Sequence, residues 1–489
     1  MISEKLKKAR EYEENNAKNI DDSQRPVYHI SSYVGWMNDP NGFSYYNGKY
    51  HLFYQYHPYS LNWGPMHWGH VISKDLIHWE YLPCAIAPDS DFDSFGCFSG
   101  SAIETPDGKH LLMYTGVYEN GENQAIQTQC IAMGDGLNYE KYNLNPVIDE
   151  KNLPDKASKF DFRDPKIWKE NDGSYACIIG NRFPDGSGAL LIYRSDDFTN
   201  WKFDTVIDKC NNEYGRMWEC PDYFELDGKK VILVSPQDML KNGYEFHNGN
   251  GTLCLIGNYD EKSKSFKREN IQAIDYGIDF YAPQTILSPD GRRIMIAWMQ
   301  NWDCCNPPMT NPKWFGQMTI ARELNIVNGR LIQNPVKELE NIRTNKVCYS
   351  DIISGENKLT GICGRTIDIT VEINPYGDKI YNEFAMKIAS GNKFFTAITY
   401  DVCKSILSVD RSNSGSCRDS VHDRKCIVKN QNGKIKLRIL IDRFSVEIFV
   451  NDGEQAISTT IYTQQEDDDI IFYVDDKVKI DIEKYDLKI

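Results

Sequence analysis

The chain has 489 residues, of which 41% are hydrophobic and 26% charged, as expected for a soluble globular protein of several domains. Its 55 Lys and Arg against 70 Asp and Glu give a net charge of −15, which argues against a general nucleic-acid-binding protein, because such proteins present a basic surface to phosphates. The sequence also contains no apolar run approaching the roughly 18 residues of a membrane helix.

The N-terminal segment, MISEKLKKAREYEENNAKNI, is charged throughout and lacks the apolar stretch of a secretory signal. We therefore expect a cytoplasmic protein and interpret residues 1–25 as a polar arm, helical or frayed. The 14 cysteines form no Cys-x-x-Cys pair and no Cys/His metal spacing. In a reducing compartment they are expected to be free thiols, most of them buried.

A turn followed by an apolar strand recurs five times between residues 26 and 333. The turns begin at Asn47, Asp107, Asp172, Asp227 and Asp290, so that they lie 55 to 65 residues apart. Each starts with Asn-Gly or Asp-Gly, the strongest local signal for a β-hairpin. Five hairpins at this period predict a five-bladed β-propeller, and the alternative is an irregular all-β domain with ordinary hairpins.

The composition changes near residues 334–350. All ten tryptophans lie between Trp36 and Trp314, and Asn334-Pro335 followed by VKELENIR predicts a short linker helix. Residues 351–489 then show apolar residues at every second position, for example Ile367, Ile369, Val371 and Ile373. This alternation is typical of half-buried antiparallel strands and predicts a β-sandwich. The predicted fold is therefore all-β: a five-bladed β-propeller followed by a C-terminal β-sandwich.

Three carboxylates stand at matching places in the propeller repeat. Eight residues before each turn lie Asp39, Ser99, Asp164, Glu219 and Ala282. If these segments are the inner strands of the blades, Asp39, Asp164 and Glu219 converge at one end of the central channel. The alternative is that the two Asp-Pro pairs only initiate turns.

Converging carboxylates suit two kinds of chemistry. They can bind Ca²⁺ or Mg²⁺, or they can act on a glycosidic bond as acid, base and nucleophile. No loop supplies further metal ligands at short spacing, whereas tryptophans and polar groups near the same strand ends suit a sugar. These are Trp36, Trp63, Trp68, Trp298, Trp302, Asn38, Gln55 and Arg163.

At these residues the chain resembles the β-fructofuranosidases of glycoside hydrolase family 32, which include invertases, sucrose-6-phosphate hydrolases and fructan hydrolases. The motifs that carry the resemblance are WMNDPNG at 36–42, FYQYHP at 53–58, WGPMHWGH at 63–70, FSGSA at 98–102, RDP at 163–165 and EC at 219–220. They span most of the first 300 residues in the order of the family. The propeller and sandwich of that family agree with the fold predicted from the repeat.

The resemblance implies a retaining mechanism with Asp39 as nucleophile, Glu219 as general acid and base, and Asp164 as stabiliser of the transition state. It implies a fructose-binding site formed by Trp36, Asn38, Gln55, Trp63, Phe98, Ser99, Arg163 and Trp298. It implies no metal and no cofactor. The expected partner is a small sugar, not a nucleic acid or a membrane, and the oligomeric state stays open.

The leaving group is less well defined by the sequence. A cytoplasmic location favours sucrose 6-phosphate or sucrose, and the 6-phosphate would require a Lys or Arg that the sequence alone does not single out. Hydrolysis of fructans or fructooligosaccharides, fructosyl transfer to another sugar, and sugar binding without catalysis are the alternatives.

Overall fold

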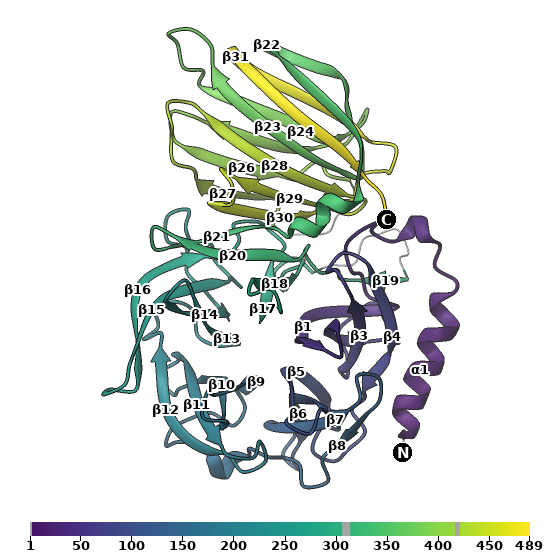
Figure 1. Cartoon of the computed structure of the whole chain (residues 1–489), viewed down its shortest axis with the longest axis vertical. Helices are drawn as coiled ribbons and strands as arrows, with labels where there is room; N and C mark the ends of the chain where they lie inside the picture. Colours follow the sequence, from purple (N-terminus) through teal and green to yellow (C-terminus); the bar gives the residue numbers. More distant parts are fainter. Residues whose placement is uncertain (1, 306–312, 416–420) are drawn as a thin grey trace.

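The computed structural model describes residues 2–305, 313–415 and 421–489, and in them it shows a propeller joined to a C-terminal sandwich (Figure 1). The strands of blades 1 and 2 are β1 (Gly35–Tyr46), β2 (Lys49–His57), β3 (His67–Ser73), β4 (Trp79–Ile86), β5 (Gly96–Glu104), β6 (His110–Glu119), β7 (Ala125–Gly134) and β8 (Tyr139–Lys141). Those of blade 3 are β9 (Phe162–Lys169), β10 (Tyr175–Arg182), β11 (Gly188–Ser195) and β12 (Lys202–Lys209). No helix in the described ranges is long and apolar enough to cross a membrane.

Blades 4 and 5 complete the ring. Their strands are β13 (Trp218–Leu226), β14 (Lys229–Pro236), β15 (Leu253–Asp260), β16 (Ser265–Ala273), β17 (Tyr281–Leu287), β18 (Arg293–Trp298), β20 (Arg322–Val327) and β21 (Arg330–Pro335). The short β19 (Trp314–Phe315) pairs in parallel with β1. The first strand of each blade packs against the first strand of the next, so that β1, β5, β9, β13 and β17 surround the central axis (Figure 1).

The hairpin turns form where the sequence places them. Asn47-Gly48 and Asp227-Gly228 close two-residue hairpins, with positive φ angles of 48° and 75° in the first and 49° and 75° in the second. Positive φ at both positions matches the right-handed twist of the flanking strands, and Asn, Asp and Gly tolerate it best. These turns lie at the end of the propeller opposite the start of the inner strands, which therefore all begin at the same end.

The sandwich is one continuous sheet folded into two layers (Figure 1). Its strands are β22 (Arg343–Cys363), β23 (Ile367–Pro375), β24 (Glu383–Ser390), β25 (Thr396–Asp401), β26 (Ile406–Asp410), β27 (Asp423–Ile427), β28 (Ile435–Asp442), β29 (Ser445–Val450), β30 (Gln455–Thr460) and β31 (Asp469–Leu487). The two longest, β22 and β31, pair with each other and pass from one layer to the other. The first part of β31 pairs with β24, and its second part pairs with β23. The predicted alternation is confirmed in β23, where Ile367, Ile369, Val371 and Ile373 are all buried.

The linker helix predicted over 334–350 is present only in part, because it starts later and is shorter than predicted. Asn334 and Pro335 end strand β21, and the helical part is a short 3₁₀ helix, η3 (Lys337–Ile342), with no side-chain cap. The Asn334 side chain donates to the Asp452 carbonyl instead of capping a helix, at 2.8 Å. Strand β22 already begins at Arg343, so the chain passes from the last blade to the sandwich through Val336 and η3 only.

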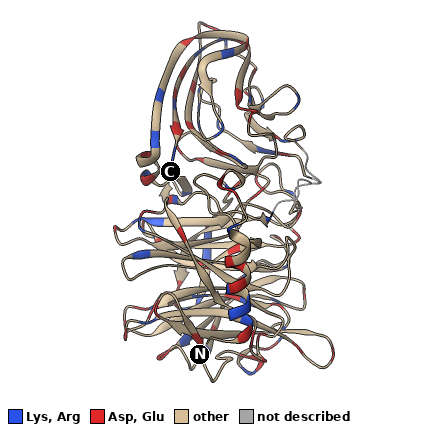
Figure 2. Cartoon of the chain, turned by 90° about the vertical axis from the view of Figure 1, so that its right-hand side faces the viewer, with Lys and Arg blue, Asp and Glu red and all other residues tan. Residues whose placement is uncertain are grey.

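The N-terminal segment is folded. Helix α1 (Glu4–Ala17) runs along blade 1, with acidic and basic residues interspersed on it (Figures 1 and 2). The amide of Cys84 donates to Glu13 of the helix at 2.7 Å, and Arg10 donates to the Cys84 carbonyl at 2.9 Å. The short 3₁₀ helix η1 (Asp22–Gln24) follows α1. The arm is therefore part of the propeller wall and not frayed.

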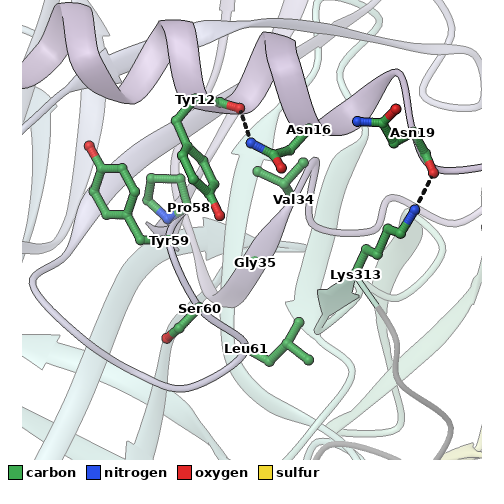
Figure 3. A pocket seen from close by; sticks show the side chains of 10 residues that line it. All are labelled: Tyr12, Asn16, Asn19, Val34, Gly35, Pro58, Tyr59, Ser60, Leu61 and Lys313. Atoms are coloured by element: carbon green, nitrogen blue, oxygen red, sulfur yellow. Dashed lines mark hydrogen bonds between the residues drawn. The ribbon is translucent and has the colours of Figure 1, made fainter.

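A cavity of about 400 Å³ lies between α1, the segment 34–35 that enters β1, and the loop that follows β2 (Figure 3). Tyr12 and Tyr59 meet edge to face across it, with ring centroids 5.0 Å apart. Lys313 closes one side by donating to the Asn19 carbonyl at 2.5 Å (Figure 3). None of the three site carboxylates lines this cavity.

Buried charges join the propeller to the sandwich. His29, which precedes β1, contacts Asp442 at 2.8 Å and Glu447 at 2.9 Å in the sandwich. Arg322 of blade 5 also contacts Glu447 and reaches Asp275 at 2.9 Å. Each charge has a partner of opposite sign, which burial of charge requires.

The cysteines in the described residues are free thiols, as predicted, and most are buried. Cys417 lies outside the described residues.

Candidate active site

Asp39, Asp164 and Glu219 come together at the end of the central channel where the inner strands begin. They lie on β1, β9 and β13, and one residue contacts two of them: the Cys220 amide donates to Asp164 at 2.9 Å, and its thiol donates to Asp39 at 3.4 Å. The exposed fraction is 8% for Asp39, 5% for Asp164 and 13% for the Glu219 side chain. Three mostly buried carboxylates therefore share one locus.

The sequence analysis treated Glu219 as the equivalent of Asp39 and Asp164 in the repeat, and this alignment is wrong by one residue in blade 4. Each inner strand has a pairing irregularity that includes the first residue of an Xaa-Pro or Ser-Gly dipeptide. These dipeptides are Asp39-Pro40, Ser99-Gly100, Asp164-Pro165, Cys220-Pro221 and Ala282-Pro283. The equivalent of Asp164 is therefore Cys220, and both have positive φ, at 68° and 48°.

The reason for the offset is the hairpin of blade 4. Its turn has two residues, because Leu226 pairs with Lys229, whereas in blade 3 Lys169 pairs with Tyr175 across five residues. Blade 1 also has a two-residue turn, but a second irregularity between Asn41 and Ser44 restores the count. Glu219 thus belongs to a different set of equivalent positions, those directly before the Xaa-Pro or Ser-Gly dipeptide of each blade. The members of this set are Asn38, Phe98, Arg163, Glu219 and Tyr281.

Asp39 accepts hydrogen bonds from neutral donors. The Ser99 hydroxyl donates to Oδ2 at 2.7 Å, and the Asn38 amide donates to Oδ1 at 3.1 Å. The Trp36 indole in turn donates to Asn38 at 2.7 Å and fixes the direction of that amide. Burial raises the pKa of Asp39 and the charge of Glu219 adds to the rise, whereas the hydrogen bonds from Ser99 and Asn38 lower it.

Glu219 is held by a cation and a phenol. Arg163 donates to Oε1 through Nε at 3.0 Å and Nη2 at 2.8 Å, and the Tyr281 hydroxyl donates to Oε2 at 2.6 Å. Gln127 accepts from Arg163 Nη1 at 3.4 Å and from the Phe162 amide at 2.8 Å. Arg163 therefore pairs with Glu219 and not with its neighbour Asp164.

Asp164 sits in a left-handed backbone conformation with both ends tied. Its amide donates to the Thr115 hydroxyl at 2.9 Å, and its Oδ2 accepts from the Cys220 amide. Burial raises the pKa of Asp164 to about 7; the charge of Arg163 opposes this rise, and those of Glu219 and Asp39 add to it. Asp164 therefore binds a proton more readily than an isolated aspartate does.

The remaining predicted residues lie around this cluster. Gln55 is buried and donates to the Cys97 carbonyl at 2.9 Å. Trp63 is 40% exposed and meets Phe98 edge to face at 5.8 Å. Trp298 is fully buried. Its ring centroid lies 5.0 Å from that of Trp302 and 6.0 Å from that of Trp36, so its side chain packs against both rings.

The sequence analysis did not identify three residues of the cluster: Thr115, Gln127 and Tyr281. An alignment of the repeats on their prolines would have made Tyr281 equivalent to Glu219, and Cys220 equivalent to Asp39. Thr115 and Gln127 lie on β6 and β7, where nothing local marks them. Within residues 2–305, 313–415 and 421–489, no group of three His, Cys, Asp or Glu is placed to hold a metal ion.

Comparison with known proteins gives matches over nearly the whole chain. The model for "Glycosyl hydrolases family 32 N-terminal domain" matches residues 29–335, and that for "Glycosyl hydrolases family 32 C terminal" matches residues 338–488. The chain is 35% identical over 470 residues to a sucrose-6-phosphate hydrolase of Escherichia coli, covering 93% of both chains. It is 38% identical over 476 residues to a levanase of Bacillus subtilis, covering 90% of this chain and 67% of that protein.

Solved structures agree. A GH32 beta-fructofuranosidase of Bombyx mori has a TM-score of 0.83 at 35% identity, covering 99% of this chain and 98% of that one. A sucrose-6-phosphate hydrolase from Lactobacillus gasseri has a TM-score of 0.85 at 29% identity, covering 100% and 97%. In a further structure, a mutant of the Bombyx mori enzyme is in complex with sucrose.

Proposed function

Since the chain belongs to glycosyl hydrolase family 32, whose members similar to it cleave sucrose-type fructosides, we propose that it is a retaining β-fructofuranosidase that works through Asp39, Glu219 and Asp164. The observation that carries the proposal is the convergence of three carboxylates in different surroundings. Asp39 accepts from the neutral donors Ser99 and Asn38, whereas Glu219 lies between Arg163 and Tyr281. Such a difference suits two carboxylates with two roles.

In the first step Asp39 attacks the anomeric carbon of the fructosyl unit. The bond from that carbon to the glycosidic oxygen breaks, and Glu219 gives its proton to the departing oxygen. The Ser99 and Asn38 hydrogen bonds stabilise Asp39 as a carboxylate and hold its oxygens in place. For a sucrose-type substrate, the products are a fructosyl ester of Asp39 and free glucose or glucose 6-phosphate.

In the second step water replaces Asp39. Glu219, now ionised, takes a proton from the water as the oxygen attacks the same carbon, and Asp39 leaves as a carboxylate. Two inversions give net retention. Arg163 and Tyr281 keep Glu219 oriented in both steps, because each holds a different carboxylate oxygen.

Asp164 stabilises the positive charge that develops on the fructosyl ring, and fructose hydroxyls donate to it. These new hydrogen bonds favour the ionised form of Asp164. Glu219 must carry a proton at the start of the first step, because it acts there as the general acid.

We propose sucrose 6-phosphate and sucrose as substrates. The relatives named sucrose-6-phosphate hydrolase and raffinose invertase support this choice, and the levanase supports fructans as the alternative. A phosphorylated sugar does not cross a membrane freely, so sucrose 6-phosphate as substrate supports our proposal of a cytoplasmic location. Transfer of the fructosyl group to a sugar in place of water is the other alternative.

The test is fructose release from sucrose, sucrose 6-phosphate and inulin, side by side, with Glu219→Ala as control. The proposal predicts release from at least one sucrose-type substrate and loss of that release in the variant. Release from inulin alone would contradict the choice of substrate. Release from none of them would contradict the function.

A further inference from the structure

A second cavity, of about 900 Å³, lies at the same end of the propeller as the three carboxylates. Its lining comes from three loops, which follow β10, β12 and β14. Because the inner strands begin at this end, β10, β12 and β14 all finish at this end too. The cavity therefore lies between blades 3 and 4 and beside the start of β13, which carries Glu219.

Two arginines of this cavity have side chains without a partner among the residues that the structure describes. Among the arginines in residues 2–305, 313–415 and 421–489, Arg182 and Arg216 are the two whose guanidinium groups make no hydrogen bond and no ion pair. The others are engaged, as Arg163 is by Glu219 and Arg268 is by Asp208 at 2.7 Å. Two unengaged guanidiniums that line one cavity are available to bind an anion.

The loops that carry them are cross-linked. Asn212 donates to the Asp185 carbonyl at 2.9 Å, which ties the loop after β12 to the loop after β10. The Arg216 amide donates to the Gln237 carbonyl at 2.9 Å, which ties it to the loop after β14. The backbone at Arg216 is therefore fixed by a neighbouring blade before any ligand binds.

The same loops connect to the catalytic cluster. Asn250, in the loop after β14, donates to Asp303 at 2.7 Å, and that segment carries Trp302. Trp302 stacks on Trp36 with ring centroids 5.9 Å apart, and Trp36 orients Asn38 beside Asp39. In the other direction Arg216 precedes Glu219 by three residues, at most about 11 Å of extended chain.

We propose that Arg182 and Arg216 bind the 6-phosphate of a glucosyl leaving group, so that this cavity is the subsite for glucose 6-phosphate. The inference rests on the proposed hydrolysis of β-fructosides. The phosphate of sucrose 6-phosphate lies one pyranose ring away from the bond that is cleaved, which matches a cavity beside the start of β13. Planar guanidiniums bind a phosphate through two parallel N–H groups each.

The acidic residues of the cavity fit the same ligand. Asp185 is neutralised by Lys209 at 2.5 Å. Glu213 and Asp238 also line the cavity and can accept hydrogen bonds from the glucose hydroxyls. The cavity thus offers cations for the phosphate and acceptors for the sugar.

The experiment compares kcat/KM for sucrose 6-phosphate with kcat/KM for sucrose in the wild type, in Arg182→Gln, in Arg216→Gln and in the double variant. Since each guanidinium contributes a charge-assisted hydrogen bond, the ratio is expected to fall about tenfold in each single variant and about 100-fold in the double variant. Arg194→Gln is the matched control, because Arg194 pairs with Glu170 and Asp204 in blade 3, outside this cavity, and its ratio should stay at the wild-type value. An unchanged ratio in the double variant, or the same fall in Arg194→Gln, would overturn the assignment.

Calorimetric binding of glucose 6-phosphate and of inorganic phosphate separates this inference from the proposed function. Both probes should bind the wild type and bind the double variant at least tenfold more weakly. If the wild type cleaves neither substrate, the proposed function fails, and this binding comparison alone decides the subsite. Equal binding of both proteins to glucose 6-phosphate would overturn it.

Discussion

Removing the Ser99 hydroxyl tests how the nucleophile is kept ionised. Ser99 is 2% exposed and donates to Asp39 Oδ2 at 2.7 Å, whereas burial and the charge of Glu219 both raise the pKa of Asp39. In Ser99→Ala this opposing hydrogen bond is lost, so the pKa of Asp39 rises further. The ionised nucleophile then forms only at higher pH.

The magnitude follows from the kind of hydrogen bond. A hydrogen bond to a charged group contributes about 1.5 to 3 kcal/mol. At tenfold per 1.36 kcal/mol, kcat/KM on the acidic side of the profile should fall by about 10- to 150-fold. At alkaline pH, where Asp39 is ionised in both proteins, the loss should be smaller.

The assay is the pH dependence of kcat/KM for sucrose, for which the account predicts a bell-shaped profile. The acidic limb of Ser99→Ala should lie at higher pH than that of the wild type. Ser101→Ala is the matched control: Ser101 lies on the same strand, and its hydroxyl donates to the Pro165 carbonyl at 2.7 Å and not to Asp39. An acidic limb that stays in place in Ser99→Ala, or moves equally in Ser101→Ala, would refute the reasoning.

Four further predictions follow from the site and the fold. Glu219→Ala and Asp39→Ala should each lower kcat/KM on sucrose by at least about 1,000-fold, and near-normal fructose release in either would contradict its role. Treatment with EDTA should leave fructose release unchanged, since no metal is expected to take part; loss of release would contradict this. Burial alone would lower the pKa of His29, but hydrogen bonds to Asp442 and Glu447 raise this pKa from 6.5 to about 9. This stabilisation is therefore complete below about pH 6.5 and lost as pH rises through about 9, so urea unfolding should show wild-type stability falling over that range and a flatter dependence in His29→Gln. Gly100→Ala should lower the free energy of unfolding by about 1 to 3 kcal/mol, because its Cβ would lie 2.0 Å from the Met113 carbonyl oxygen; an unchanged urea midpoint would contradict this.

The propeller could be predicted from sequence because its signals are local. Asn47-Gly48 and Asp227-Gly228 specify their turns by backbone conformation alone, and the strands beside them follow. The layered path of β22 and β31 could not be predicted in the same way. These strands pair across more than 100 residues, and nothing within either strand marks the point where it changes layer.

The linker shows how a local signal can be overridden. Asn334-Pro335 is a good helix start in isolation, but Asn334 pairs with Glu323 in the last blade and its side chain reaches Asp452 in the sandwich. Because the Asn334 side chain makes this contact between the domains, it does not cap a helix. Only the six residues of η3 remain helical.

The candidate site was predictable in its members more than in its arrangement. Eight-residue counting found Asp39, Asp164 and Glu219, and the structure brings all three together. Counting eight residues back from each turn also made Glu219 equivalent to Asp39 and Asp164, which is wrong by one residue. The count assumed that every hairpin has the same length. Tyr281, which holds Glu219 from the opposite side to Arg163, was missed for this reason.

The stereochemistry of transfer to methanol tests the central claim most directly. The enzyme is incubated with sucrose in aqueous methanol, and the anomer of the methyl fructofuranoside that forms first is determined by NMR. Attack by Asp39 followed by replacement predicts methyl β-D-fructofuranoside, with formation lost in Asp39→Ala. Formation of the α-anomer would show a single displacement and contradict the assignment of Asp39 as nucleophile.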